Sequence, residues 1–170
     1  MKPVEKKDPV KYASLNQEFN SFVNSVNAVY STKFEKNVLD FSNLFNDTIL
    51  IYHLIRKGMP YGLFEQLKLM CPFKETDWAN YLNISIKTLQ RHKKEANYVF
   101  KPIHTEKIIE ITEVNQLGIE VFDTKKQFYS WLNSSSYALG NLKPLELLKD
   151  SYGKELVMSE LNRIEHGIFA

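Results

Sequence analysis

The strongest constraint on the fold is the spacing of apolar residues within residues 74–95, KETDWANYLNISIKTLQRHKKE. Ala79 and Leu82 are expected on a first helix. Ile84 follows in the turn, and Leu89 is expected on a second helix. A small residue at position 79 lets the two helices cross closely, and the three larger residues fill the wedge between them. This spacing is typical of a helix-turn-helix, a unit that binds DNA.

Polar residues at the expected helix ends support the same interpretation. Thr76 or Asp77 can cap the first helix and Ser85 the second, because short side chains with an oxygen accept hydrogen bonds from the first amides of a helix. Turns of this kind often carry glycine. Asn83 occupies that place here, and asparagine is the next best residue for a positive φ.

The outward face of the second helix carries the side chains that would contact DNA. Arginine and glutamine read base edges, and serine, threonine and lysine suit phosphates. The predicted DNA-binding residues are Ser85, Lys87, Thr88, Gln90, Arg91, Lys93 and Lys94, and His92 is expected on the same outward stretch. The alternative is a helical hairpin with a solvated basic face, and whether this copy still binds DNA is a separate question.

A second apolar pattern lies near the N-terminus, after a lead of residues 1–11 that we interpret as flexible. Apolar residues three and four apart predict one helix with a buried seam. Its members are Tyr12, Leu15, Phe19, Phe22, Val26 and Val29. The seam can pack on its own domain or on another subunit, and both alternatives stay open.

Further helices are expected along the rest of the chain. One begins near Asn46 or Asp47 and ends before Gly58, which can take the left-handed cap conformation. Residues 61–70 form a short helix stopped by Pro72. A longer one follows residue 101, with an apolar face formed by Ile103, Ile108, Ile111, Val114 and Leu117. Strand signals are nearly absent, so the chain is predicted to be all-α.

The pattern changes from Asp123, which is expected to cap a helix carrying Phe128, Trp131 and Leu132. This helix breaks at Asn133, and a long connection holds apolar residues before Pro144 restarts a helix. The last helix is expected after Gly153, with an apolar face and an end at Gly167. That face consists of Leu156, Val157, Leu161 and Ile164.

Composition narrows the class of protein. The 170 residues contain no apolar run near the roughly 20 needed to cross a bilayer, and the first residues lack the apolar segment of a secretion signal. Cys71 is the single cysteine, so no internal disulfide is possible and the cytoplasm is the expected location. The net charge of +2 neither demands nor excludes nucleic acid.

Enzymatic chemistry is not expected. The four histidines fall on separate expected elements without ligand spacing, so neither a metal nor another cofactor is predicted. These residues are His53, His92, His104 and His166. There is also no glycine-rich phosphate loop, and Cys71 beside Pro72 is expected to be buried and inert.

Residues 128–170 resemble the toxin-binding domain of the Xre/MbcA/ParS antitoxin family. The resemblance is carried by Trp131-Leu132, Ala138-Leu139-Gly140, the run PLELL from Pro144, Gly153, Val157 and the ending LNRIEHGIF from Leu161. RKGMP and ISIKTLQRHKKE also resemble the helix-turn-helix half of the family, so the resemblance covers roughly residues 50–170. Asn141 and His166 depart from the pattern, where a glycine and an aromatic residue are usual.

The resemblance implies a function and a partner. Such antitoxins are encoded beside a RES-domain toxin that consumes NAD or modifies a target with it. This chain would obstruct the NAD pocket of that toxin with its last helix and tail, through the predicted toxin-binding residues Arg163, Glu165, His166, Gly167, Ile168 and Phe169. The helix-turn-helix would repress the operon, and a homodimer is expected because two recognition helices read adjacent turns of DNA.

Within this domain the connection after Asn133 is expected to fold back over short helices, with Tyr137 and Leu139 as plugs. Gly140 would supply a turn where a side chain would clash. Trp131, Leu139, Pro144 and Val157 are interpreted as core.

The predicted domains are an N-terminal extension over residues 1–39, a helix-turn-helix domain over 40–118 and a toxin-binding domain over 119–170. Two other functions stay open. One is a stand-alone helix-turn-helix regulator without a toxin partner, and the other is an antitoxin that no longer binds DNA.

Overall fold

The computed structural model describes residues 9–31, 40–95 and 97–167, with side chains from residue 12 onward. Every regular element in these ranges is helical, so the predicted all-α class is confirmed. The elements are α1 (Pro9–Tyr30), η2 (Phe41–Asn46), α2 (Thr48–Lys57), α3 (Tyr61–Met70), α4 (Glu75–Tyr81), α5 (Ile86–Lys94), α6 (Pro102–Phe122), α7 (Lys125–Leu132), η3 (Tyr137–Leu139), α8 (Pro144–Leu147) and α9 (Ser151–Glu165).

The chain divides into two compact units that are not contiguous in sequence. Of the described residues, the N-terminal unit contains 9–31, 40–70, 87–95 and 97–108, and the C-terminal unit contains 71–86 and 109–167. The division therefore falls within α5 and within α6. The boundaries after residues 39 and 118 stay a prediction. The flexible lead was predicted over residues 1–11, but α1 begins at Pro9, so the prediction is wrong for residues 9–11, and residues 1–8 lie outside the described residues.

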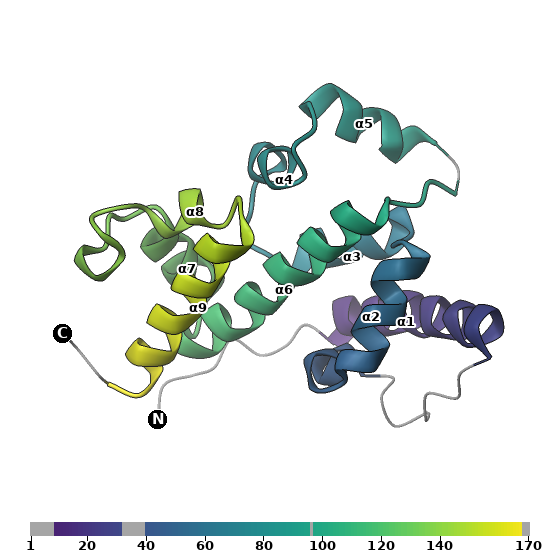
Figure 1. Ribbon diagram of the computed structural model, residues 1–170, viewed down its shortest axis with the longest axis horizontal. Helices are drawn as coiled ribbons and strands as arrows, with labels where there is room; N and C mark the ends of the chain where they lie inside the picture. Colours follow the sequence, from purple (N-terminus) through teal and green to yellow (C-terminus); the bar gives the residue numbers. More distant parts are fainter. Residues whose placement is uncertain (1–8, 32–39, 96, 168–170) are drawn as a thin grey trace. The chain divides into compact units, whose positions relative to one another are not determined.

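In the N-terminal unit α1 packs against α2 and α3, as Figure 1 shows. Leu15, Phe19 and Val26 of the expected seam are buried, so the seam packs within its own unit. Val29 was expected on the seam but is 56% exposed. Ile49 of α2, although apolar, is also exposed.

Gly58 marks a close approach of two backbone segments in this unit. Its φ of 85° is positive as predicted, but its ψ of 136° lies outside the left-handed helical region. A Cβ here would overlap the carbonyl oxygen of Phe100. The Phe100 amide donates to the Met59 carbonyl at 2.8 Å, and the Met59 amide donates to Thr105 Oγ1 at 2.9 Å. Glycine is therefore required by space as well as by φ.

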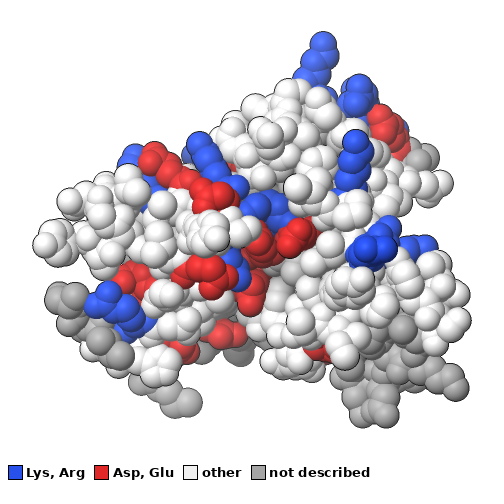
Figure 2. Space-filling view, in the orientation of Figure 1, with Lys and Arg blue, Asp and Glu red and all other residues white. Residues whose placement is uncertain are grey.

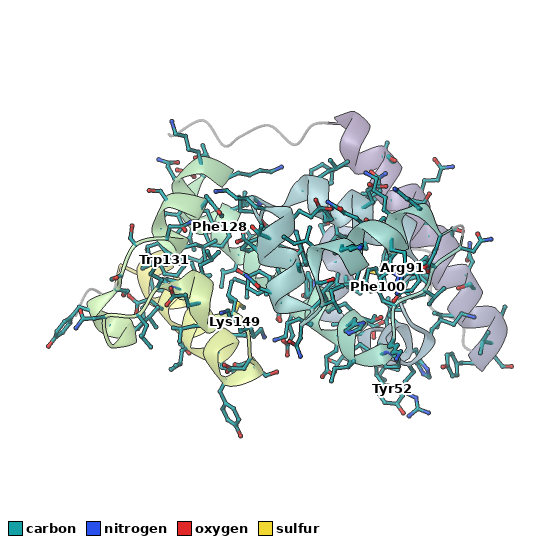
Figure 3. The ribbon with its side chains drawn as sticks, turned by 90° about the horizontal axis from the view of Figure 1, so that it is seen from above. Tyr52, Arg91, Phe100, Phe128, Trp131 and Lys149 are labelled. Carbon is teal, nitrogen blue, oxygen red and sulfur yellow. The ribbon has the colours of Figure 1, made fainter. Side chains whose placement is uncertain are left out.

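The C-terminal unit is built on an aromatic cluster around α7. Phe128 is fully buried, and its ring stacks on those of Phe122 and Trp131, each at a centroid distance of 6.1 Å. A Cβ at Gly118 would overlap the Phe128 ring, so the glycine lets α6 and α7 approach closely. Figure 3 shows Phe128 and Trp131 side by side on α7. Trp131 is only half-buried, which corrects its assignment to the core.

Four other residues of this unit were expected to be buried. Leu139, Pro144 and Val157 are buried as expected, whereas Leu156 is 53% exposed. On α6, the expected apolar face is wrong at Ile103, which is 71% exposed.

The long connection after Asn133 holds η3, which contacts α9. Leu139 is a plug as predicted, but Tyr137 is 87% exposed and is not one. Gly140 has a φ of 68°, and a Cβ there would meet no atom within 4 Å. The reason for glycine at this turn is therefore the left-handed backbone and not the predicted clash.

Three predicted helix starts are corrected. Glu75 begins α4, and Asp77 accepts from the Lys74 amide at 2.8 Å, so neither Thr76 nor Asp77 stands at the cap position. Thr124, and not Asp123, caps α7. The helix α9 begins at Ser151, because Asp150 accepts from the Gly153 amide at 2.8 Å and places that glycine within the first turn.

Candidate functional site

The helix α5 presents the predicted DNA-binding side chains in the N-terminal unit. Lys87, Gln90 and Arg91 are exposed, and the last turn is basic. His92 was expected on the outward stretch but is buried, because its ring stacks on Tyr98 at a centroid distance of 3.7 Å. This stacking ties the helix to the segment that follows it. Of the other predicted DNA-binding residues on α5, Thr88 is half-buried and the rest are exposed.

Two of the basic side chains on α5 already have acidic partners. Arg91 Nε lies 3.3 Å from the Glu95 carboxylate, and Lys93 Nζ lies 2.8 Å from that of Glu65. Exposed ion pairs of this kind contribute at most about 1 kcal/mol. A phosphate can therefore compete for these cations at small cost.

The turn before α5 has the predicted backbone geometry. Asn83 has a φ of 51°, as expected for the residue that stands in for glycine. The Ile84 amide donates to the Ala79 carbonyl at 3.0 Å and closes the turn. Ala79 and Leu82 are buried and Ile84 is half-buried. Packing of α4 on α5 lies across the two units and stays a prediction.

The helix α4 is anchored to the rest of the C-terminal unit. Tyr81 Oη donates to the Leu145 carbonyl of α8 at 3.3 Å, and Tyr129 Oη of α7 donates to Asp77 Oδ2 at 3.2 Å. Burial raises the pKa of Tyr81 above its usual range, with Asp77 as a second cause. The Tyr81 phenol is therefore a neutral donor, and the two hydrogen bonds fix the first helix of the predicted DNA-binding pair to α7 and α8.

The helix α9 is held on α6 by polar contacts at its start. Lys154 Nζ lies 2.8 Å from Glu113, and Ser151 Oγ donates to Glu110 at 2.9 Å. Burial of the Lys154 ammonium lowers its pKa, but hydrogen bonds to Glu113 and Glu155 outweigh this and the pKa is raised. Lys154 therefore stays charged, and its side chain fixes the rotation of α9 about its axis.

That rotation leaves two apolar side chains of α9 in solvent. Tyr152 and Leu156 are 89% and 53% exposed, whereas Val157 and Leu161 are fully buried. Residues four apart lie on the same face of a helix, so Tyr152 and Leu156 form one exposed apolar pair. In Figure 2 the surface over this unit shows acidic and basic side chains beside one another within a larger uncharged area.

The predicted toxin-binding residues lie at the end of α9. Arg163 Nη1 is 3.4 Å from the Glu160 carboxylate, and His166 Nδ1 donates to the Asn162 carbonyl at 2.7 Å. Glu165 is exposed, and Gly167 ends the helix with a φ of 67°, as predicted. Ile168 and Phe169 lie outside the described residues.

A comparison with protein families decides what this unit is. Residues 117–167 match the family model of the antitoxin Xre/MbcA/ParS C-terminal toxin-binding domain. Residues 117–167 therefore belong to this family of toxin-binding domains. The match confirms the family expected from the sequence and implies a toxin as protein partner. No curated protein matches the chain.

The toxin-binding domain thus consists of the end of α6 together with α7, η3, α8 and most of α9. Sequence reasoning missed the exposed pair on α9, because it started the helix after Gly153 and placed Leu156 in the core. The signal was the spacing of Gly153, Val157 and Leu161, which share one face and leave Tyr152 and Leu156 outside it.

The described residues include no group of three histidine, cysteine, aspartate or glutamate side chains that could hold a metal ion. None of the described helices is long and apolar enough to cross a membrane.

Proposed function

We propose that this antitoxin belongs to a type II toxin–antitoxin system and blocks the NAD pocket of a cognate RES-type toxin. The observation that carries the proposal is the toxin-binding domain over residues 117–167. Antitoxins of this family are partners of RES-type toxins, which act on NAD. The partner is expected to be encoded beside this chain.

The exposed surface of α9 supports binding of a protein. Tyr152 and Leu156 offer apolar area without a partner in the described part of the chain, and aromatic anchors dominate most protein interfaces. Arg163, Glu165, His166 and Gly167 follow at the end of the helix. We assign Ile168 and Phe169 to the toxin pocket, where an apolar tail would exclude NAD.

Repression of the operon is the second half of the proposal. The basic face of α5, with Lys87 and Arg91 exposed, supports contact with operator DNA. A homodimer within a larger toxin–antitoxin complex would place two such helices on adjacent turns of the operator. Replacement of both Lys87 and Arg91 by alanine should then abolish preference for the operator, with Lys101→Ala as control.

The toxin half is tested by an NAD consumption assay with the product of the neighbouring gene. Increasing amounts of this chain should stop NAD loss at a fixed molar ratio. A version ending at Asn162 should leave the toxin active, because it lacks the end of α9 and the tail. If neither chain slows the reaction while the neighbouring protein consumes NAD, the proposed inhibition is wrong.

A further inference from the structure

The C-terminal unit contains an open pocket beside the turn of the predicted helix-turn-helix. Five of its lining residues come from α4 and the following turn, and one comes from the toxin-binding domain. The pocket is lined by Ala79, Asn80, Asn83, Ile84, Ser85 and Lys149. The single lysine gives a positive charge to a pocket otherwise lined by amides, a hydroxyl and aliphatic groups.

Lys149, which is labelled in Figure 3, lines this pocket from the turn between α8 and α9. It is exposed, and no hydrogen bond or ion pair of its ammonium occurs among the described residues. The neighbouring Asp150 carboxylate accepts from the Gly153 amide and is thereby engaged in the cap of α9. The lysine therefore adds a cation beside side chains that can donate hydrogen bonds.

The turn that carries Lys149 is fixed in place. The Leu147 carbonyl oxygen lies where a Cβ of residue 153 would stand, so only glycine permits this approach of α8 and α9. Tyr81 of α4 donates to the Leu145 carbonyl, four residues before Lys149. Both contacts lie within the C-terminal unit, so they hold α4 and the turn that carries Lys149 beside one another.

We propose that this pocket binds a phosphate of the DNA backbone and that Lys149 is a DNA contact supplied by the toxin-binding domain. The proposal rests on the proposed DNA binding and extends it to a residue outside the helix-turn-helix. Lysine, serine and asparagine side chains are common phosphate partners, and such contacts fix a protein on DNA without reading sequence. The family match assigns residues 117–167 to toxin binding alone.

The test compares Lys149→Ala with Lys126→Ala, a matched exposed lysine on α7 that does not line the pocket. Binding of the full chain is measured by fluorescence anisotropy. One duplex comes from upstream of the gene of this chain and the other is unrelated. Lys149→Ala should weaken binding to both by about 3- to 10-fold, and should lower the slope of log K against log salt by about 0.9. Lys126→Ala should change neither quantity.

The remaining outcomes are distinguishable. If the wild-type chain binds DNA and Lys149→Ala matches it in affinity and slope, the pocket is not a backbone contact, although the helix-turn-helix proposal stands. If the wild-type chain binds neither duplex, both proposals fail. A free anion is the alternative ligand of this pocket, and calorimetry with inorganic phosphate tests for it. Phosphate binding that depends on Lys149, with unchanged DNA affinity, would assign the pocket to a free anion and overturn the proposal.

Discussion

Glycines in the toxin-binding domain serve two different physical needs. At Gly140 the backbone has a φ of 68° and the space around it is empty, so a side chain would meet only the cost of a left-handed conformation. At Gly153 the conformation is helical, but the Leu147 carbonyl occupies the place of a Cβ. Gly140 is thus required by the backbone conformation of one residue, whereas Gly153 is required by the packing of α8 against α9.

Gly153→Ala should therefore be the more destabilising of the two substitutions. We expect it to lower the free energy of unfolding by about 2 kcal/mol or more, since backbone must shift. Gly140→Ala should lower it by about 1 kcal/mol. Urea unfolding followed by tryptophan fluorescence measures this, because Trp78 and Trp131 both belong to the C-terminal unit. Equal losses for the two variants would contradict the packing argument.

Cys71 is a buried thiol whose chemistry should be suppressed in the fold. Burial raises its pKa from 9.0 to about 12, and the nearby Lys125 lowers it only in part. At pH 8 the thiolate fraction should be about 1000-fold lower than in the unfolded chain. The contribution of the protonated Cys71 thiol to the free energy of unfolding is complete below pH 9 and is lost as the pH rises to about 12.

Thiol labelling with a disulfide reagent at pH 8 checks this prediction. The native chain should react at least about 1000-fold more slowly than the chain in urea, where the thiol is free to ionise. Rapid reaction of the native chain, at a rate near that in urea, would show that Cys71 is not held in a dry environment.

At the scale of elements, α9 has one face that packs in the core and another that is exposed and can bind a partner. Val157 and Leu161 fill the core, while Tyr152 and Leu156 remain exposed. The contact of Lys154 with Glu113 of α6 fixes which face turns outward. The exposed pair is therefore available for an interface without any change in the domain.

Tyr152→Ala and Leu156→Ala should each weaken toxin binding by about 10-fold or more, as expected for apolar anchors of an interface. Neither should change the free energy of unfolding by more than about 0.5 kcal/mol. Ile103→Ala is the matched control, because Ile103 is 71% exposed on α6 outside the family match. Calorimetric titration with the toxin measures the affinities, and unchanged binding by both α9 variants would move the interface elsewhere.

At the scale of the whole molecule, the sequence predicted the class and most of the helices, because their apolar periods and glycine ends are local signals. The buried seam of α1 and the positive φ of Asn83 were predicted from such signals. Helix starts were less predictable. Aspartate and threonine are both favourable N-cap residues, so the sequence does not distinguish Asp123 from Thr124. The structure places Thr124 at the N-cap position.

Exposure could not be predicted where an apolar residue lies beside a buried one. Tyr137 and Leu139 both belong to η3, yet only Leu139 is buried. The pocket at Lys149 depends on contacts between segments about 65 residues apart, such as that of Tyr81 with Leu145, and no local pattern encodes them. The predicted partner-facing residues therefore need direct tests.

The central claim is that this chain holds a toxin through its C-terminal domain. Co-purification tests it most directly: the neighbouring gene product is expressed with the tagged full-length chain, and separately with a tagged version ending at Asn162. The neighbour should follow the full-length chain in a fixed ratio and should be lost with the shorter one. A neighbour that never follows the full-length chain would contradict the claim and favour a stand-alone helix-turn-helix regulator.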